Sequence, residues 1–285
     1  MSSTVTVFEV GPRDGLQSRG DMVPTTKKIA LIDALSRTGL RKIEATSFVS
    51  PRWVPQMADA GEVMAGIVRH EGVTYAALTP NVTGLGRALA AGCGEVAIFA
   101  SSSDGFSRAN LNCSIAESFE RFAPVLEEAR AAGVPVRGYL STVIACPFDG
   151  PTDPGEVSRW AGRLLEMGCY EVSLGDTIGA GDTEALDWLL DGLLAHTDAE
   201  RIAGHFHDTA GVAADLVALA LDRGVRTFDA SVAGLGGCPY APGAPGNVDT
   251  RCVLEVIEAK GFRHGIDLDA LARAEAVARA ATNAI

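Results

Sequence analysis

The sequence has little positive charge. Its 24 lysine and arginine residues are outnumbered by 36 aspartate and glutamate residues, which gives a formal net charge of -12. Nucleic acids and anionic membrane surfaces are bound by basic surfaces, so the composition argues against both as partners. A small anionic ligand is not excluded, because a few local arginines are enough to bind one.

The sequence also lacks paired cysteines and long apolar runs. No Cys-x-x-Cys pair occurs among its six cysteines, and such a content in 285 residues favours reduced thiols in a cytoplasmic compartment. No apolar run approaches the ~20 residues of a membrane-spanning helix. The first residues, MSSTVTVFEV, have no basic region followed by an apolar stretch, unlike a secretory signal. We therefore expect a cytoplasmic protein with no membrane partner.

The order of apolar patterns indicates an α/β fold. Short β-rich runs alternate with amphipathic helical patterns, which predicts parallel strands joined by crossover helices. The eight expected strands are residues 5–10, 42–45, 74–78, 95–100, 136–141, 171–174, 201–205 and 227–232. The clearest expected helices are 25–37, 114–132, 152–167, 182–195, 210–223 and 247–259. Ser114 and Glu117 form a capping-box pattern at the start of the second of these.

Eight such units without a linker predict a closed (β/α)8 TIM barrel. We expect one domain over residues 1–285, with an additional C-terminal helix at 268–280. A doubly wound open sheet is the alternative, but the first strand is followed by GPRDG and not by the G-x-G-x-x-G of dinucleotide-binding sheets.

A barrel places its active site at the carboxyl ends of the strands. Polar residues follow each expected strand, and these are the candidates for a site. They are Arg13, Asp14, Gln17, Glu44, Ser47, Asn81, Asn110, Tyr139, Ser141, Thr142, Ser173, Asp176, Thr177, His205, His207, Asp208, Cys238 and Asn247.

The sequence His205-Phe206-His207 ends the seventh expected strand and predicts a metal site. Residues two apart in a strand face the same side, so both imidazoles point one way. Closure of the barrel brings strands seven, eight and one together, which places Asp14 beside the histidines and lets Asn247 reach them. Two imidazoles, a carboxylate and an amide oxygen suit Mg2+ or Mn2+ and leave zinc open. Histidines without a ligand, in the core or on the surface, are the alternative.

Arg13 is next to Asp14, where a guanidinium can stabilise a developing oxyanion or enolate. Its other interpretation is a structural ion pair with Glu44 or Asp176. Glu44 is the lone charge in the run I-E-A, and an unpaired carboxylate there would be costly, so we expect it to pair with Arg13.

The segment 234–247 reads GLGGCPYAPGAPGN, with five glycines and three prolines. A surface connector is the simplest interpretation, and a P-loop is excluded because no Gly-Lys-Ser/Thr follows. The third interpretation is an active-site lid that delivers the Cys238 thiol and the Asn247 amide. An accessible thiol in such a mouth can act as acid, base or nucleophile.

Together these motifs resemble those of the 3-hydroxy-3-methylglutaryl-CoA lyase family over nearly the whole chain. The matching stretches are VFEVGPRDGLQ (7–17), IEATSFVSPRWVPQM (43–57), LTPN (78–81), NLNCSIAESFERF (110–122), VRGY (136–139), GCYEVSLGDTIG (168–179), HFHDT (205–209) and SVAGLGGCPYAPGAPGN (231–247). The last of these is the most specific for the lyases. The chain departs from the family at Ala210, where a tyrosine is usual, and in the smaller and more polar segment 100–108.

The resemblance implies a function and a set of roles. It implies retro-Claisen cleavage of an acyl-CoA substrate, 3-hydroxy-3-methylglutaryl-CoA, to acetyl-CoA and acetoacetate, with Mg2+ or Mn2+ as cofactor. The matched metal ligands are Asp14, His205, His207 and Asn247. The matched catalytic positions are Arg13, Glu44 and Cys238, and we add Asp14 and His205 to them. Substrate contacts are expected from Arg13, Gln17, Asn110, Tyr139, Ser173 and Thr177.

Two alternatives to this function stay open. The first is a lyase for a related 3-hydroxyacyl-CoA such as citramalyl-CoA, since the departures lie in loops around the expected mouth. The second is an inactive metal-binding barrel that serves as a binding protein. We also expect a homo-oligomer, with a dimer as its form.

Overall fold

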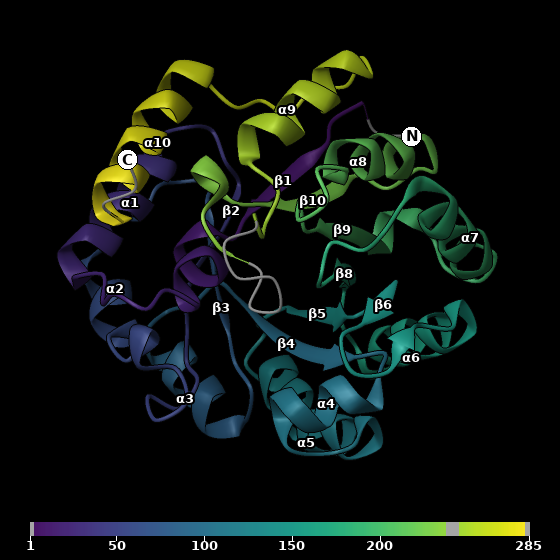
Figure 1. Cartoon of the computed structure of the whole chain (residues 1–285). Coiled ribbons are helices and arrows are strands. Elements are labelled where there is room, and N and C mark those ends of the chain that lie inside the picture. Colours follow the sequence, from purple (N-terminus) through teal and green to yellow (C-terminus); the bar gives the residue numbers. More distant parts are fainter. Residues whose placement is uncertain (1–2, 238–244, 283–285) are drawn as a thin grey trace.

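The computed structural model describes residues 3–237 and 245–282. Eight parallel strands close into a barrel in it, as the sequence predicts (Figure 1). The barrel strands are β1 (Thr6–Glu9), β2 (Lys42–Ser47), β3 (Thr74–Leu78), β4 (Glu95–Ser101), β5 (Val136–Ser141), β8 (Glu171–Asp176), β9 (Ile202–Phe206) and β10 (Thr227–Ala230). A small antiparallel hairpin, β6 (Ala145–Cys146) and β7 (Gly150–Pro151), follows β5.

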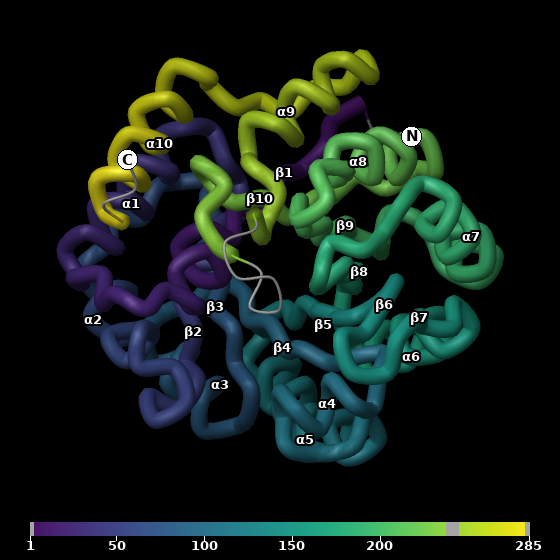
Figure 2. Tube along the Cα trace, viewed as in Figure 1, coloured from purple at the N-terminus to yellow at the C-terminus, as the bar shows by residue number. Residues whose placement is uncertain are grey.

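Helices form an outer ring around the barrel, and the chain passes round the ring in sequence order (Figures 1 and 2). They are α1 (Thr25–Leu35), α2 (Ala60–Gly66), α3 (Val82–Ala90), α4 (Asp104–Leu111), α5 (Ile115–Ala131), α6 (Pro154–Met167), α7 (Thr183–Leu194), α8 (Ala213–Asp222), α9 (Thr250–Ala259) and α10 (Leu268–Thr282). Four short helical turns complete the elements: η1 (Gly11–Gly15), η2 (Pro55–Met57), η3 (Ala199–Arg201) and η4 (Val232–Gly234). No helix in the described ranges is long and apolar enough to cross a membrane.

The barrel closes where β1 pairs with β10, in the register Thr6 to Thr227 through Glu9 to Ala230. The first and last strands are therefore neighbours, although more than two hundred residues separate them. This pairing brings η1, which follows β1, next to the ends of β9 and β10. The positions of Asp14 and the two histidines depend on it.

The two faces of the barrel strands differ in chemistry. In β5, Val136 and Leu140 face the helices and join the main hydrophobic core, while Arg137 and Tyr139 alternate with them and face the barrel interior. Residues i and i+2 of a strand share a face, which explains the alternation. The outer face supplies the apolar burial that stabilises the fold, at ~1.5–3 kcal/mol for each large side chain. The inner face carries polar groups such as Arg137, together with small separate apolar clusters such as that of Phe8, Val10 and Ala76.

Helix α5 forms where the capping pattern predicts it. The Ser114 side chain accepts a hydrogen bond from Glu117 N at 3.3 Å, and the Glu117 carboxylate accepts one from Ser114 N at 2.7 Å. Such a cap stabilises a helix by ~0.5–2 kcal/mol. The short helices α2, α3 and α4 are not among the elements that the sequence predicts.

The C-terminal helix is confirmed, and it packs beside α1 (Figure 1). Lys27 Nζ donates to the carbonyl of Ala280 at 2.9 Å, and Arg19 Nη2 donates to the carbonyl of Thr282 at 2.9 Å. These donors satisfy carbonyl groups in the last turn of α10, which have no partner within the helix. The last helix thus covers the outside of the barrel near its closure.

Candidate active site

A cleft of about 1260 Å³ opens at the carboxyl end of the barrel. Twelve of the candidate residues were given a metal, catalytic or substrate role, and nine of these line the cleft: Arg13, Asp14, Gln17, Asn110, Tyr139, Ser173, Thr177, His205 and His207. Glu44 is fully buried against Arg13, and the buried Asn247 contacts Asp14. Cys238 lies outside the described residues. The barrel mouth thus brings together eleven residues that are far apart in sequence.

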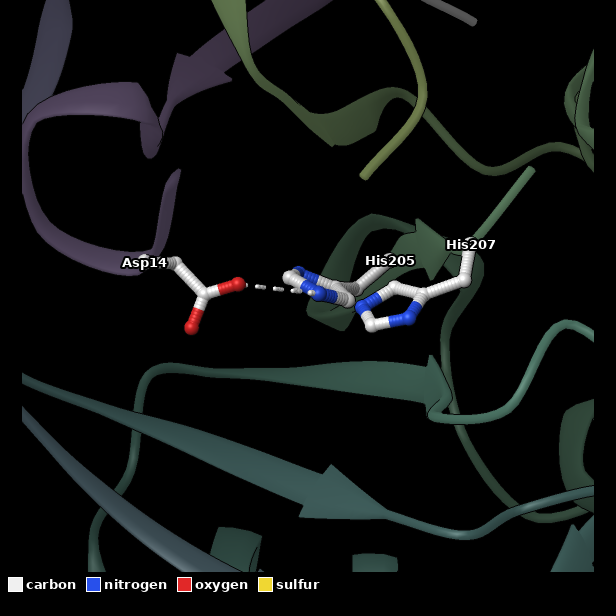
Figure 3. A group of neighbouring side chains, drawn as sticks. All are labelled: Asp14, His205 and His207. Carbon is white, nitrogen blue, oxygen red and sulfur yellow. Dashed lines mark ion pairs between the residues drawn. The ribbon is translucent and has the colours of Figure 1, made fainter. Parts of the chain in front are cut away.

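Asp14, His205 and His207 converge on one point at the mouth (Figure 3). Each offers a ligand atom, and these atoms all lie within 4.8 Å of one another. Asp14 comes from η1, whose first turn bends back because three successive N–H groups, from Arg13 to Gly15, point to the carbonyl of Val10. His205 and His207 share the inner face at the end of β9, while Phe206 is 3% exposed and packs in the outer core. This alternation confirms the strand prediction.

The donor set fits a divalent cation. His205 Nε2 and Asp14 Oδ2 are 3.9 Å apart, which is too far for a hydrogen bond. Two ligands of one cation at ~2.1 Å each are at most ~4.2 Å apart, so this separation leaves room for an ion between them. His207 Nδ1 is buried and has no hydrogen-bond partner among the described residues. The other ring nitrogen of His207, Nε2, points toward His205 in Figure 3, which is the direction that a ligand nitrogen of this cluster needs.

Asn247 is the fourth predicted ligand. A β-bridge joins its backbone to that of His207, which places the side chain at the site. Its Nδ2 donates to Asp14 Oδ2 at 2.9 Å, so the amide nitrogen and not the oxygen faces the carboxylate. The side chain can serve as a ligand once the amide turns over and presents its oxygen.

The charges of the cluster suit metal binding. Burial would raise the pKa of Asp14, but the positive charges of Arg13 and His205 outweigh it and lower that pKa to about 2. Burial, with His205 nearby, lowers the pKa of His207 to about 4. Near neutral pH the carboxylate is therefore ionised and the His207 imidazole is neutral. These are the forms that coordinate a cation.

Arg13 is held in place under the cleft by Glu44. Its Nε donates to Glu44 Oε2 at 2.6 Å, and its Nη1 pairs with the Asp14 carboxylate. Tyr139 donates to the same Glu44 oxygen at 3.1 Å, and its ring lies 5.3 Å from the guanidinium. The expected Arg13–Glu44 pair is thus present, while Asp176 accepts from backbone N–H groups of its own loop. The guanidinium is both fixed and exposed to the cleft.

Sequence reasoning missed three charged residues that support this site. Glu9 accepts hydrogen bonds from Gly11 N, Val232 N and the Thr250 hydroxyl at 2.7–2.9 Å, and so joins η1, η4 and the start of α9. Arg137 and Asp229 face the barrel interior below His205. Each is a lone charge in an apolar strand. That signal identified Glu44 and could have identified these three.

The described flanks of the glycine-rich segment reach the cleft. Gly237 lines it and forms an antiparallel bridge with Pro245. Gly236 has φ +121°, a conformation that favours glycine, and a Cβ there would lie 2.9 Å from Asn247 Nδ2. Residues 238–244 lie outside the described part of the chain. The two ends of the segment thus meet at the metal ligands, which favours a role at the site over a simple connector.

The fold and the site together define a (β/α)8 barrel with a candidate metal centre at its mouth, and comparison with known proteins identifies the family. The HMGL-like family model matches residues 4–278. The hydroxymethylglutaryl-CoA lyase of Pseudomonas mevalonii is 54% identical over 269 residues, covering 94% of this chain and 89% of the relative. The chain belongs to the HMGL-like family.

Two further relatives agree. The 3-hydroxy-3-isohexenylglutaryl-CoA/hydroxy-methylglutaryl-CoA lyase of Pseudomonas aeruginosa is 53% identical over 267 residues, covering 94% of this chain and 89% of the relative. The crystal structure of the HMG-CoA lyase from Brucella melitensis matches with a TM-score of 0.97 at 52% identity, covering 98% of this chain and 99% of that one. The resemblance seen in the sequence motifs is therefore confirmed over the whole barrel.

Proposed function

We propose that this chain, acting as one barrel domain, cleaves 3-hydroxy-3-methylglutaryl-CoA to acetyl-CoA and acetoacetate with a divalent cation, Mg2+ or Mn2+. The observation that carries the proposal is the meeting of Asp14, His205 and His207 beside Arg13 at the barrel mouth. Cleavage of a carbon–carbon bond next to a hydroxyl group and a thioester needs a centre that binds oxygen atoms and a cation that stabilises an enolate.

The cleft has room for an acyl-CoA. Its inner part is lined by polar groups such as Ser173 and Thr177, which suit the hydroxyl and carboxylate of the acyl group. Its outer part carries Asn110 and the exposed Arg108, with Arg121 nearby. Arginines bind phosphate oxygens well, so we assign this rim to the phosphates of CoA.

The metal ligands are assigned to Asp14, His205, His207 and, through its amide oxygen, Asn247. A divalent cation held there supplies Lewis-acid polarisation of the substrate oxygens that it binds. Mixed oxygen and nitrogen donors without a thiolate favour Mg2+ or Mn2+ over a structural zinc. The protein itself supplies the position of the substrate and the groups that move protons.

The bond cleavage needs a proton acceptor and an enolate stabiliser. We assign the acceptor to the Asp14 carboxylate, whose Oδ1 pairs with Arg13 and whose Oδ2 would hold the cation together with His205 Nε2. As the hydroxyl proton moves to the Asp14 carboxylate, the C2–C3 bond breaks and its electrons pass to the thioester. The new carbonyl belongs to acetoacetate, and the enolate of acetyl-CoA is left. Arg13, held by Glu44, donates hydrogen bonds to the enolate oxygen.

The enolate then needs a proton at its carbon. We assign this proton to the thiol of Cys238, because that residue follows Gly237, which lines the cleft. Transfer of the thiol proton gives acetyl-CoA, and the proton that Asp14 took from the hydroxyl returns to the Cys238 thiolate and restores the thiol. If Cys238→Ala turned over substrate as fast as the wild type, this assignment would be wrong although the lyase reaction could stand.

A second candidate substrate has a larger group at C3. The P. aeruginosa relative is named for isohexenylglutaryl-CoA, and Leu78, Phe99, Phe106 and Phe122 line one side of the cleft here. These apolar side chains are placed to hold an alkyl group. A kcat/KM panel that includes a 3-isohexenyl substrate and citramalyl-CoA separates this candidate from the first.

The direct test is incubation of the purified chain with 3-hydroxy-3-methylglutaryl-CoA and either Mg2+ or Mn2+, with detection of both products by mass spectrometry. Equal amounts of acetyl-CoA and acetoacetate are expected, and Asp14→Asn serves as the control without activity. Absence of product with either metal would favour an inactive barrel that serves as a binding protein. Light scattering tests the expected dimer, and fractionation of the native cells tests the expected cytoplasmic location.

A further inference from the structure

We infer that Asp229, fixed by Arg137, is a positioning residue that sets the tautomer and the direction of the His205 ring. The inference rests on the proposed function, in which His205 Nε2 is a metal ligand. Asp229 does not line the cleft, and it reaches the site only through other side chains. Its effect on the reaction would therefore be indirect.

The contacts of Asp229 are short and come from three sides. His205 Nδ1 is 3.0 Å from Oδ2, and the hydroxyl of Ser173 donates to the same oxygen at 2.7 Å. Arg137 Nη1 donates to Oδ2 at 3.1 Å, and its Nη2 forms an ion pair with Oδ1 at 2.8 Å without the geometry of a hydrogen bond. The Asp229 side chain is fully buried. A buried carboxylate with this many donors has one orientation.

Arg137 is itself immobilised. It is fully buried, and its Nε donates to Glu171 Oε2 at 2.7 Å. Its guanidinium lies 4.5 Å from the ring centre of Phe8 and 5.0 Å from that of Tyr139. The Arg137–Asp229 pair is thus built into the rigid interior of the barrel, where β5 and β10 supply its two members and β8 supplies Glu171 as a further partner of Arg137. Because His205 is hydrogen-bonded to this pair, the pair fixes the position of the His205 ring.

The ionised carboxylate decides which nitrogen of His205 carries the proton. Beside Arg137, Asp229 stays ionised and can only accept hydrogen bonds. His205 Nδ1 must therefore be the donor, and the neutral ring keeps its lone pair on Nε2. That nitrogen is the one that faces Asp14. The carboxylate thus presents the lone pair to the metal site, as carboxylate–histidine pairs do at metal centres.

The two histidines of the site differ in this respect. His205 has a buried carboxylate behind its ring, whereas the described residues offer His207 Nδ1 no hydrogen-bond partner. The support for ligand geometry is therefore concentrated on one ring. This asymmetry predicts that a change at Asp229 acts on the metal site through His205.

The first test is Mn2+ binding to the metal-free full chain, followed by electron paramagnetic resonance, for the wild type and Asp229→Asn. An asparagine keeps the size of the side chain but can donate to Nδ1, which selects the other tautomer. We expect about 10–100-fold weaker Mn2+ binding. Glu95→Gln is the matched control, because Glu95 is a buried carboxylate inside the same barrel that contacts Lys42 and Tyr170. This control should bind Mn2+ as the wild type does.

A second measurement reads the tautomer in the wild type itself, and a variant serves only to assign the signal. In protein labelled with 15N-histidine, long-range 1H–15N spectra at pH 9 report the protonated nitrogen of each of the five histidines, and His205→Gln assigns the signal. We expect the proton on Nδ1 of His205. The other tautomer, or Asp229→Asn binding Mn2+ as tightly as the wild type, would overturn the inference. If the wild type bound no Mn2+, the proposed function would fail instead, and the tautomer would still decide the inference.

Discussion

Two of the buried ion-pair clusters inside the barrel lie at opposite ends of the strands, a lower cluster at the amino-terminal end and an upper cluster at the carboxyl end. At the amino-terminal end, Glu95 Oε2 accepts from Lys42 Nζ at 2.6 Å, and Oε1 accepts from the hydroxyl of Tyr170 at 2.6 Å. At the carboxyl end, Arg13 and Tyr139 both donate to Oε2 of Glu44, while Glu44 Oε1 is buried without a partner among the described residues. In the lower cluster, the protein alone satisfies the Glu95 carboxylate. In the upper cluster, Glu44 Oε1 is a spare acceptor.

The difference between the clusters separates stability from function. A buried charge without its full set of partners is costly, and such groups persist where a ligand completes them. The lower cluster links β2 and β4 to Tyr170, the residue that precedes β8, and both Glu95 oxygens are paired without a ligand. The upper cluster lies against the cleft and shares Arg13 with Asp14. The amino-terminal end of a barrel thus contributes to stability, and the carboxyl end carries the chemistry.

The largest expected effect is at Arg13. Arg13→Met removes the donor to the enolate and leaves Glu44 and Asp14 without their cation. Loss of one donor to a developing oxyanion lowers kcat about 10²–10³-fold, and we expect at least that here. The measurement is kcat with saturating metal. Lys42→Met, the equivalent change in the lower cluster, should keep kcat within about twofold, and a comparable loss there would remove the distinction between the clusters.

The next effect in size is loss of the metal site. Asp14→Asn removes the anionic ligand and should weaken Mn2+ binding about 100-fold or more, since ligand changes exceed the 10–100-fold effect of their supporting residues. Titration calorimetry measures it. In parallel, a chelator should abolish activity in the wild type, and added Mg2+ or Mn2+ should restore it. Activity that survives complete removal of divalent metal would contradict the assignment of this cluster.

A smaller effect is expected from pH. Burial opposes protonation of His205, but its hydrogen bond to Asp229 and the charge of that residue raise its pKa above 6.5. The proton competes with the cation for the ligand form of the ring. Metal affinity should therefore fall by up to about tenfold per pH unit as the pH drops through this raised pKa. His207, with a pKa of about 4, adds no loss until much lower pH.

The pH prediction is checked by Mn2+ titrations between pH 8 and pH 5.5. His264→Gln is the control, because His264 pairs with Glu258 outside the cleft and should leave the profile unchanged. A flat profile over this range would mean that His205 is not a ligand. If titrations extended below this range showed a loss that begins only near pH 4, the competition would be assigned to His207 alone.

Much of this fold and site could be predicted from the sequence, because local patterns determine the strands and the direction of their side chains. The alternation of His205, Phe206 and His207 predicts which rings face inward, and the order of strands predicts that Asp14 meets them. The pairing of Glu44 with Arg13 followed from the cost of a lone buried charge. These inferences need only the period of a strand and the closure of a barrel.

Which partners the supporting residues behind the ligands meet could not be predicted in the same way. Asp229 meets Arg137 across 92 positions of sequence, and Glu9 meets Thr250 across 241. Which inward side chains reach each other depends on the stagger of the strands, and no local period reports it. Short helices such as α4 were missed for a related reason, since a segment of eight residues offers little periodic signal.

The smallest expected effect on activity is at the lower cluster, and it is the sharpest test of the comparison. Glu95→Gln leaves Lys42 without its carboxylate, and because the Lys42 side chain is 26% exposed, water compensates part of the loss. We expect the free energy of unfolding to fall by ~1–3 kcal/mol and kcat/KM to stay within about twofold. Thermal unfolding and steady-state kinetics on one preparation measure both. A large loss of kcat with little loss of stability would mean that the lower cluster also serves the reaction, and the separation between the two ends of the barrel would not hold.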